Sequence, residues 1–139
     1  MSQPLVSVIV FCYNQEQYVS EALHSAFSQN YGNIEFVISD DASIDGTFAA
    51  IEKTVGANTA GRRISLNRNA LNLGIAAHLD TLYRIASGEL LVNAAGDDLS
   101  CPDRVATLVE AWCRYGRAPS LIYSNAANFT AVHAFSGYQ

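Results

Sequence analysis

Short apolar runs alternate with longer segments of helical periodicity along nearly the whole chain. The predicted strands are Val6 to Cys12, Ile34 to Ser39, Arg63 to Asn67, Glu89 to Asn93 and Ser120 to Ser124. The predicted helices are Gln15 to Gln29, Ser43 or Asp45 to Val55, a segment after Gly74 that ends at Ser87-Gly88, and Pro102 to Tyr115. Such alternation is typical of parallel sheets covered by helices. The sequence therefore predicts an α/β fold with a mostly parallel open sheet and flanking helices.

The composition fits one folded domain and excludes several functions. The chain has 139 residues, half of them hydrophobic, which is near the usual size of a single domain. Its formal net charge of -5 provides no basic field to attract a polynucleotide, so we expect no nucleic-acid partner. No apolar run reaches transmembrane length. Cys12, Cys101 and Cys113 are an odd number without metal-ligand spacing, which favours a reducing cytoplasm over a disulfide framework.

Two pairs of aspartates each follow a predicted buried strand. Asp40 and Asp41 come after the run Ile34 to Ser39, and Asp97 and Asp98 come after a second apolar run. In open parallel sheets the carboxyl ends of the strands open onto one crevice, where ligands bind. We therefore expect four carboxylates in that crevice, their repulsion offset by metal, by hydrogen-bond donors or by a shifted protonation state. A divalent cation that holds a phosphorylated ligand is the simplest such arrangement.

Three common ligand sites of α/β proteins do not fit these residues. The segment after the first strand, Phe11 to Glu16, lacks the G-x-G-x-x-G pattern of dinucleotide-binding folds. A phosphate-cradling G-x-x-x-x-G-K-[ST] loop is also absent from the sequence. A receiver-like phosphoacceptor domain would have the clustered acids, but it would also need a lysine at a later strand end, where this chain has none.

Four segments, two of which contain the aspartate pairs, carry a resemblance to a known family. In chain order they are Val6 to Asn14, Asp40 to Thr47, Asn72 to Gly74, and Ala95 to Arg104. Together they resemble the family 2 glycosyltransferases, over roughly Pro4 to Ser124, and imply the Rossmann-like nucleotide-sugar-binding half of the fold called GT-A. The resemblance implies an enzyme that transfers a sugar from a nucleoside diphosphate sugar, with UDP-sugar favoured, to an acceptor hydroxyl by metal-assisted inverting displacement.

The resemblance also implies a cellular setting. Similar proteins act in bacterial surface polysaccharide synthesis on carbohydrate or lipid-linked acceptors. We therefore expect a cytoplasmic protein without a transmembrane segment. Peripheral attachment to the inner face of the membrane is left open, because no amphipathic basic segment is present to support it.

The same resemblance gives roles to residues near the first two strands. Cys12, Tyr13 and Asn14 are expected along a uracil base, gripping it with backbone groups and a ring edge. Asp40 is expected to accept a hydrogen bond from the ring N–H of the base. Asp41 is as consistent with a loop-capping role as with a nucleotide contact.

Later residues complete the expected site. Asn72 and Gly74 suit a ribose or a base edge, and equally a plain helix-entry turn. Asp97 is expected to meet the ribose and Asp98 to bind Mg²⁺ or Mn²⁺, for which hard oxygen ligands are suited. Two adjacent aspartates before a helix are more often a solvated cap, but their place after a buried strand favours the functional interpretation.

The chain departs from the family pattern in three places. Ala95 stands where a third acid is common, which predicts a lean metal site. His78-Leu79-Asp80 replaces the usual Ala-Arg-Asn, so an arginine contact to phosphate is lost, and neither Arg68 nor Arg84 is predicted to replace it. The family's later acidic motif does not appear. The catalytic base is therefore unknown and expected beyond Gln139, with residues 1–139 a single donor-binding domain that ends before the acceptor-binding half.

Two rival functions remain at this stage. The first is a non-catalytic nucleotide-sugar-binding module, which a catalytic acid later in the parent sequence would exclude. The second is a nucleotidyltransferase, which would need a Gly-rich, basic loop where this chain has Cys12 to Tyr18. His24, His78 and His133 lack ligand spacing and are predicted to be structural or surface residues.

Overall fold

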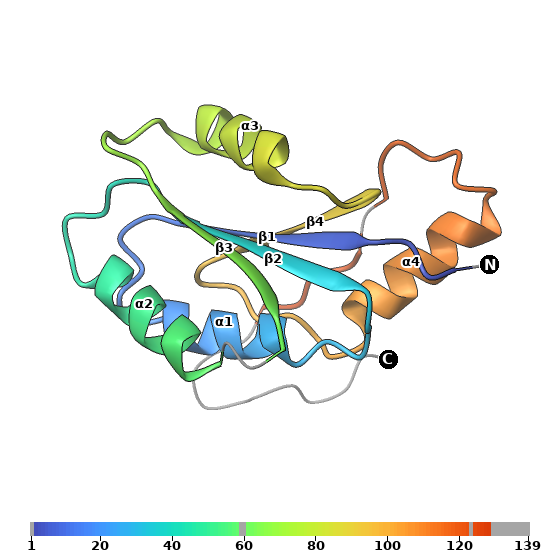
Figure 1. Ribbon diagram of the computed structural model, residues 1–139, viewed down its shortest axis with the longest axis horizontal. Coiled ribbons are helices and arrows are strands. Elements are labelled where there is room, and N and C mark those ends of the chain that lie inside the picture. The colour runs from blue at the N-terminus through green and yellow to red at the C-terminus, as the bar shows by residue number, and fades with distance from the viewer. Residues whose placement is uncertain (1, 59–60, 123, 129–139) are drawn as a thin grey trace.

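The computed structural model describes residues 2–58, 61–122 and 124–128, and strands alternate with helices throughout (Figure 1). The elements are β1 (Val6–Cys12), α1 (Val19–Phe27), β2 (Ile34–Asp40), α2 (Thr47–Ala57), β3 (Arg63–Arg68), α3 (Ile75–Ile85), β4 (Leu90–Ala95) and α4 (Arg104–Arg114). The strands form one parallel sheet in the order β3-β2-β1-β4. The predicted α/β class with a parallel sheet and flanking helices is confirmed.

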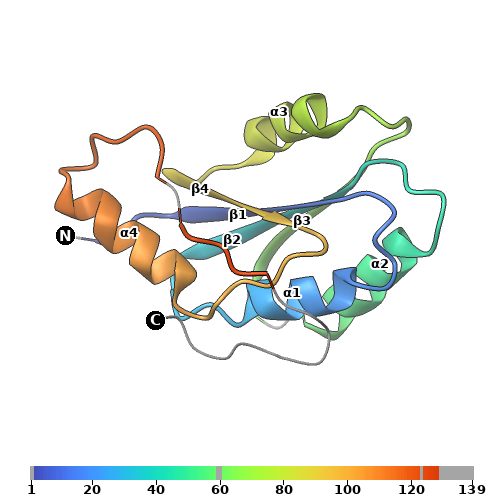
Figure 2. The ribbon, with the colours of Figure 1, turned by 180° about the vertical axis from the view of Figure 1, so that it is seen from behind.

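Helices cover both faces of the sheet (Figures 1 and 2). α1 and α2 lie together under one face and α3 lies over the other. The larger core lies on the first of these faces, where alternate residues of β1 meet α1, α2 and α4. A smaller core joins Ile9 and Val37 to Leu82 of α3. Because β1 is buried on both faces, its sequence is an almost uninterrupted apolar run.

Helix α1 begins at Val19, later than the predicted start at Gln15. The backbone N–H groups of Tyr18 and Val19 both donate to the carbonyl of Gln15 in a tight turn. The N–H of Gln15 in turn donates to the Thr47 hydroxyl at 2.7 Å. Contacts with the next loop therefore fix the residues that the periodicity assigned to the helix. The predicted apolar stripe is buried except for Tyr18.

Helices α2 and α4 also begin slightly later than predicted. α2 starts at Thr47, whose N–H donates to the Asp45 carboxylate at 2.9 Å, so Asp45 stabilises the start of the helix from outside it. α4 starts at Arg104 and not at the predicted Pro102, because residues 102–103 form a turn. Its predicted inner face is confirmed, since the four residues predicted for that face are all buried: Val105, Leu108, Val109 and Trp112.

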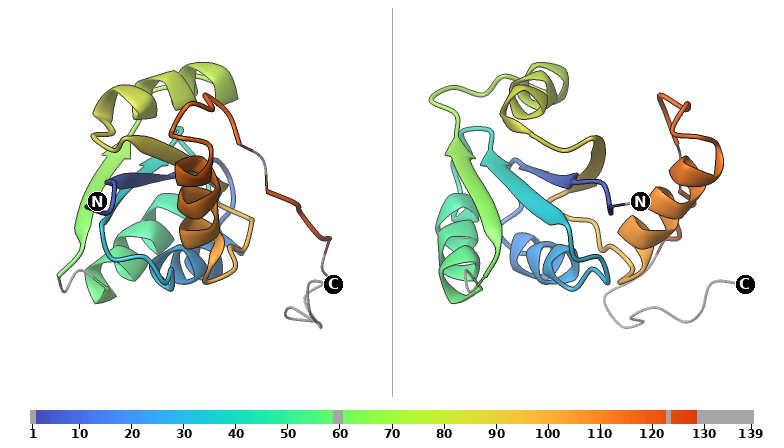
Figure 3. Two further views of the ribbon diagram at one scale, coloured as in Figure 1. Left: turned by 90° about the vertical axis from the view of Figure 1, so that its right-hand side faces the viewer. Right: turned by 45° about the vertical axis from the view of Figure 1, so that its right-hand side comes forward.

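The predicted fifth strand at Ser120 to Ser124 is wrong for residues 120–122 and 124, the described part of that segment, because none of them pairs with a strand. Leu121 is 68% exposed, so this short apolar run does not contribute the buried face that a strand needs. Figure 3 shows α4 standing beside the sheet, with the following segment leading away from it. Tyr123 and His133 lie outside the described residues. Within the described ranges, no helix is long and apolar enough to span a membrane.

Candidate nucleotide site

The carboxyl ends of the strands meet in register. Cys12 of β1 pairs with Asp40 of β2, which pairs with Arg68 of β3. Hydrogen bonds continue the ladder into the loops, from Asp41 N–H to the Cys12 carbonyl at 2.9 Å and from Gly96 N–H to the Phe11 carbonyl at 3.0 Å. Because β1 lies between β2 and β4, the two acidic motifs flank the end of β1 along one edge of the sheet. The predicted shared edge is therefore present.

Polar contacts join the loop after β1 to the loop after β2. Asn14 adopts a left-handed backbone with φ of 49°, and its N–H donates to the Ser43 hydroxyl at 2.9 Å. Its side-chain oxygen accepts the Ile44 N–H at 3.0 Å. Asparagine tolerates this backbone region better than most residues, which explains its presence here. Tyr13 precedes it and stays 45% exposed, so its ring is available at the edge while the chain beneath it is fixed.

Asp40 holds the loop that follows β2. Its side chain is fully buried, and its carboxylate accepts the backbone N–H of Ser43 at 3.0 Å and also the Ser43 hydroxyl. Arg68 Nε lies 3.4 Å from Asp40 Oδ2, the oxygen that accepts the Ser43 N–H. The structure thus gives Asp40 a loop-holding role, and the expectation that it reads the base stays a prediction.

Asp41 links the ends of β2 and β3 to the start of α3. Its carboxylate accepts the N–H groups of Leu73 and Gly74, each at 2.9 Å, and the side-chain amide of Asn69 at 2.8 Å. Burial alone would raise the pKa of Asp41. These hydrogen bonds and the nearby His78 lower it by more than burial raises it, so the pKa lies below its ordinary value. Asp41 therefore stays ionised and caps a helix distant in sequence, which its local pattern did not reveal.

Asn72 and Gly74 serve the turn that leads into α3. The Asn72 amide donates to the backbone carbonyl of Asp41 at 3.2 Å, and the Gly74 N–H is taken by the Asp41 carboxylate. Gly74 has a φ of 77°, a left-handed conformation that glycine adopts without strain. Both residues are exposed. The structure thus supplies the helix-entry role, and their expected contact with ribose or base stays a prediction.

Asp97 and Asp98 are exposed, in contrast to the first acidic pair. They follow Gly96, which is buried against β1. A Cβ on Gly96 would lie 2.7 Å from Cys12 Sγ and would also collide with the Gln15 side-chain oxygen. Only glycine lets this turn approach the end of β1 so closely. Of the four carboxylates expected in one crevice, only Asp97 and Asp98 are exposed, and Asp40 and Asp41 are buried.

The donor set at Asp97 and Asp98 fits a hard divalent cation. Mg²⁺ in nucleotide sites is typically held by about one or two carboxylates, with substrate phosphates and water completing the shell. In agreement with such a lean site, the described ranges contain no cluster of three or more His, Cys, Asp or Glu side chains able to hold a metal by themselves. Burial, with Asp40 and Asp97 nearby, raises the pKa of Cys12 to about 12, so the thiol stays protonated and is no metal ligand.

Several site residues escaped the sequence interpretation. The Cys12 side chain is 1% exposed, so only its backbone remains for the predicted nucleotide contact. Arg68 is engaged by Asp40 and stacks 4.7 Å from the Phe48 ring, and Arg84 pairs with Asp80 at 3.0 Å. Both arginines therefore have a carboxylate partner within the chain. Ser43, Asn67 and Asn69 build the loop network, which the sequence did not predict. Their only sequence signal is that they lie among polar residues near the end of a strand.

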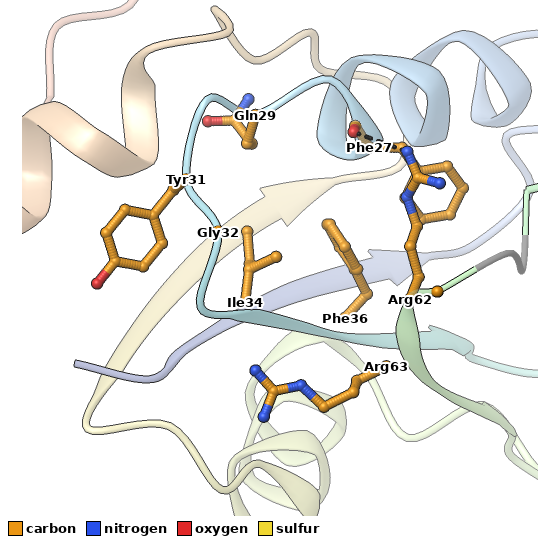
Figure 4. Close-up of a pocket in the computed structure, with 9 residues that line it drawn as sticks. Phe27, Gln29, Tyr31, Gly32, Ile34, Phe36, Arg62 and Arg63 are labelled. Atoms are coloured by element: carbon orange, nitrogen blue, oxygen red, sulfur yellow. Dashed lines mark hydrogen bonds between the residues drawn. The ribbon is translucent and has the colours of Figure 1, made fainter. Parts of the chain in front are cut away.

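Two surface hollows lie away from this edge. One is lined by residues at the starts of β2 and β3, among them Ile34 and Arg63, which is the opposite end of the sheet (Figure 4). There Arg62 lies over the Phe27 ring at 5.2 Å and donates to the Phe27 carbonyl at 3.2 Å. The other lies between β4, α4 and residues 117–122. Neither hollow is lined by residues of the two acidic motifs.

Comparison with known proteins identifies the class. Residues 7–134 match the family model described as glycosyl transferase family 2. EpsE of Bacillus subtilis (strain 168), a provisionally assigned glycosyltransferase, is 41% identical over 104 residues, covering 75% of this chain and 37% of EpsE. The Escherichia coli protein WfaP is 34% identical over 94 residues, covering 68% of this chain and 36% of WfaP. WfaP is named as a UDP-Glc:α-D-GlcNAc-diphosphoundecaprenol β-1,3-glucosyltransferase.

A solved structure gives the same answer for the fold. The mannosyltransferase PcManGT from Pyrobaculum calidifontis, in complex with GDP-Man and Mn²⁺, superimposes with a TM-score of 0.71 at 33% identity, covering 80% of this chain and 32% of that one. The parallel sheet with motifs at its carboxyl edge is thus the GT-A arrangement. The chain belongs to glycosyl transferase family 2. It spans about a third of the length of these relatives.

Proposed function

We propose that this chain binds the nucleoside diphosphate part of a sugar donor, with uridine as the nucleoside, at the carboxyl edge of the sheet. The observation that carries the proposal is the contrast between the two acidic pairs. Asp40 and Asp41 have hydrogen-bond partners in the interior, whereas Asp97 and Asp98 are exposed beside the end of β1. Exposed carboxylates at the carboxyl end of a parallel strand are available to a ligand.

The roles of the residues follow from their positions. The exposed Tyr13 ring and the adjoining backbone of Cys12 and Asn14 provide a surface for the base. In this proposal Asp97 accepts a hydrogen bond from a ribose hydroxyl, and Asp98 binds a divalent cation. A bound Mg²⁺ or Mn²⁺ supplies a Lewis acid that stabilises the leaving diphosphate. The negative edge by itself repels a diphosphate, so these two carboxylates make donor binding depend on a cation.

We further propose that the whole protein is an inverting glycosyltransferase of surface polysaccharide synthesis. The support is the family membership and the named activity of WfaP, which uses UDP-Glc and a lipid-linked acceptor. In such a reaction the acceptor hydroxyl attacks the anomeric carbon, and a general base removes its proton. The described residues that reach the carboxyl edge all have donor-side or loop-holding positions, so the base is not assigned to any of them.

Calorimetric titration with UDP, with and without Mn²⁺, tests the donor site. We expect tight binding only with the metal, and Asp98→Asn to lose that dependence because it replaces a charged ligand with a neutral one of similar shape. Asp80→Asn is the matched control, since Asp80 is an exposed aspartate of α3 that pairs with Arg84. Equal affinity for UDP in EDTA would contradict the role of Asp98.

A parallel titration with GDP tests the base. PcManGT is named with GDP-Man and WfaP with UDP-Glc, so relatives differ in their nucleotide. We expect UDP to bind more tightly than GDP, because the surface proposed for the base is small. It consists of the Tyr13 ring and the short backbone turn of Cys12 and Asn14. Tighter binding of GDP would keep the metal site but replace uridine by guanosine in the proposal.

A further inference from the structure

A chain of buried and part-buried hydrogen bonds connects α3 to Asp41. His78 of α3 is 2% exposed, and its Nε2 lies 2.7 Å from the hydroxyl oxygen of Ser39, a fully buried residue of β2. The side-chain amide of Asn67, the register partner of Ser39 on β3, donates to the same hydroxyl at 2.8 Å. Asn67 also donates to Asn69 at 3.0 Å, and Asn69 donates to the Asp41 carboxylate at 2.8 Å. His78 thus reaches the loop that Asp41 holds.

The tautomer of His78 decides what protonation does to this network. The Ser39 oxygen accepts the amide proton of Asn67, and it can either donate its own proton to Nε2 of His78 or accept one from it. When Nδ1 carries the proton, Nε2 accepts from Ser39 and the neutral ring completes the network. A proton added to Nε2 would then aim a second donor at Ser39 and require another acceptor for the serine proton, which is costly for a buried polar group.

The charges around His78 act in both directions. Burial lowers the pKa of His78, while Asp41 and Asp40 raise it, and burial prevails. α3 packs against β1 and β2. The titratable or charged groups of these elements, of the neighbouring strand β3 and of α3 itself that lie toward this end are Cys12, Asp40, Asp41, Arg68, Asp80 and Arg84. Cys12 is uncharged, Arg68 pairs with Asp40, and the last two pair with each other on the helix surface.

We propose that His78 is a positioning residue of the donor site: its neutral ring holds the Ser39–Asn67–Asn69–Asp41 chain in place, and its protonation loosens the Asp41 loop and weakens nucleotide-sugar binding at mildly acidic pH. The inference rests on the proposed donor site. It rests on two features together, the 2.7 Å contact of the buried Nε2 with Ser39 and the continuity of the network to the carboxylate that fixes Leu73 and Gly74, with Nδ1 as the protonated nitrogen of the neutral ring.

The sign of the pH effect follows from the neutral state. Since the ligand-competent loop requires uncharged His78, affinity is constant while the ring is neutral and falls as pH drops through its pKa. Each unit by which ligand binding lowers that pKa corresponds to about a tenfold loss of affinity in the acid limit. UDP-glucose is the suitable probe, because its diphosphate is esterified at both ends and does not titrate in the range in which histidine does.

The experiment compares UDP-glucose affinity in the presence of Mn²⁺ from about pH 7.5 to about pH 5, the range of histidine titration. His78→Gln keeps an oxygen that can accept from Ser39 but cannot become charged. We expect wild-type affinity to fall several-fold more than that of His78→Gln over this range. His24→Gln, which removes an exposed histidine of α1, serves as the control and should follow the wild type.

An NMR measurement on the wild type makes the test independent of the variant's folding. Ring nitrogen chemical shifts of His78 should report a proton on Nδ1. Binding of UDP-glucose should lower the pKa of His78 by the logarithm of the factor by which acid weakens binding. A proton on Nε2, or equal pH slopes in wild type and His78→Gln, would overturn the role of His78. Absence of UDP-glucose binding at neutral pH would instead remove the donor site itself, and the inference with it.

Discussion

Replacing Gly96 with alanine perturbs the site at its tightest packing contact. Gly96 joins β4 to the two exposed aspartates, and its N–H is bonded to β1. An added Cβ would lie 2.7 Å from Cys12 Sγ and 3.2 Å from Cys12 Cβ. The Gln15 side chain, which also meets this Cβ, can rotate away. Cys12 cannot, because it is buried in the central strand. The turn itself must therefore move, and Asp97 and Asp98 move with it.

The size of the effect can be estimated from competing terms. Overpacking a tight site costs about 1–3 kcal/mol, and the lower entropy of the unfolded chain returns about 0.4–1 kcal/mol. We therefore expect Gly96→Ala to lose about 1–2 kcal/mol of unfolding free energy. Gly56 of α2 is the matched control, since a Cβ there meets nothing within 4 Å. Gly56→Ala should gain about 0.5–1 kcal/mol, as expected for a helix interior.

Urea unfolding and Mn²⁺-dependent titration with UDP measure the two consequences separately. Gly96→Ala should be less stable and bind UDP more weakly, while Gly56→Ala should be more stable with unchanged affinity. Loss of affinity in Gly96→Ala should persist under conditions where the variant is fully folded, because the acids are displaced. If Gly96→Ala matched Gly56→Ala in both stability and affinity, the packing argument for this turn would be refuted.

Two further predictions concern the buried groups of this edge. Asp40→Asn should lower stability by about 1–3 kcal/mol in urea unfolding, because Arg68 and Ser43 lose a charged acceptor, yet leave the UDP to CDP affinity ratio unchanged; a shifted ratio would support the base-reading role. The raised pKa of Cys12 implies a stability contribution that is complete below its ordinary value of 9.0 and lost as pH rises toward about 12. Above pH 9.0 the wild type should therefore lose stability relative to Cys12→Ala, by at most about 1.4 kcal/mol per pH unit; parallel pH profiles would contradict it.

The fold was predictable because its core strands have strong sequence signals. β1 and β2 are buried on both faces and read as apolar runs, and each helix carries an apolar stripe of the right period. The start of α1 was predicted incorrectly because hydrogen bonds from a different loop, not the local sequence, fix Gln15. The segment after α4 was predicted incorrectly because a short apolar run is ambiguous without a partner strand.

The site was predictable in position but not in the direction of its side chains. Strand-end acids in two neighbouring motifs were enough to place Asp40 and Asp98 at one edge of the sheet. Whether each carboxylate faces inward depends on distant donors such as Asn69 and Leu73, at separations that no local pattern reports. The position of His78 in this network was likewise hidden, because its partner Ser39 lies 39 residues earlier in the chain.

The different fates of the two acidic pairs follow from the strands that carry them. β2 lies inside the sheet between β1 and β3, so the loop after it is surrounded by donors from both neighbours, and its carboxylates are satisfied internally. β4 has β1 as its one partner among the described strands, and Gly96 presses the following turn against that partner. Asp97 and Asp98 project beyond this contact with few donors nearby. Carboxylates in that position are costly to bring near a diphosphate unless a cation joins them. The same topology that makes the first pair a structural clamp therefore leaves the second pair exposed to solvent, as the proposed metal and nucleotide site requires.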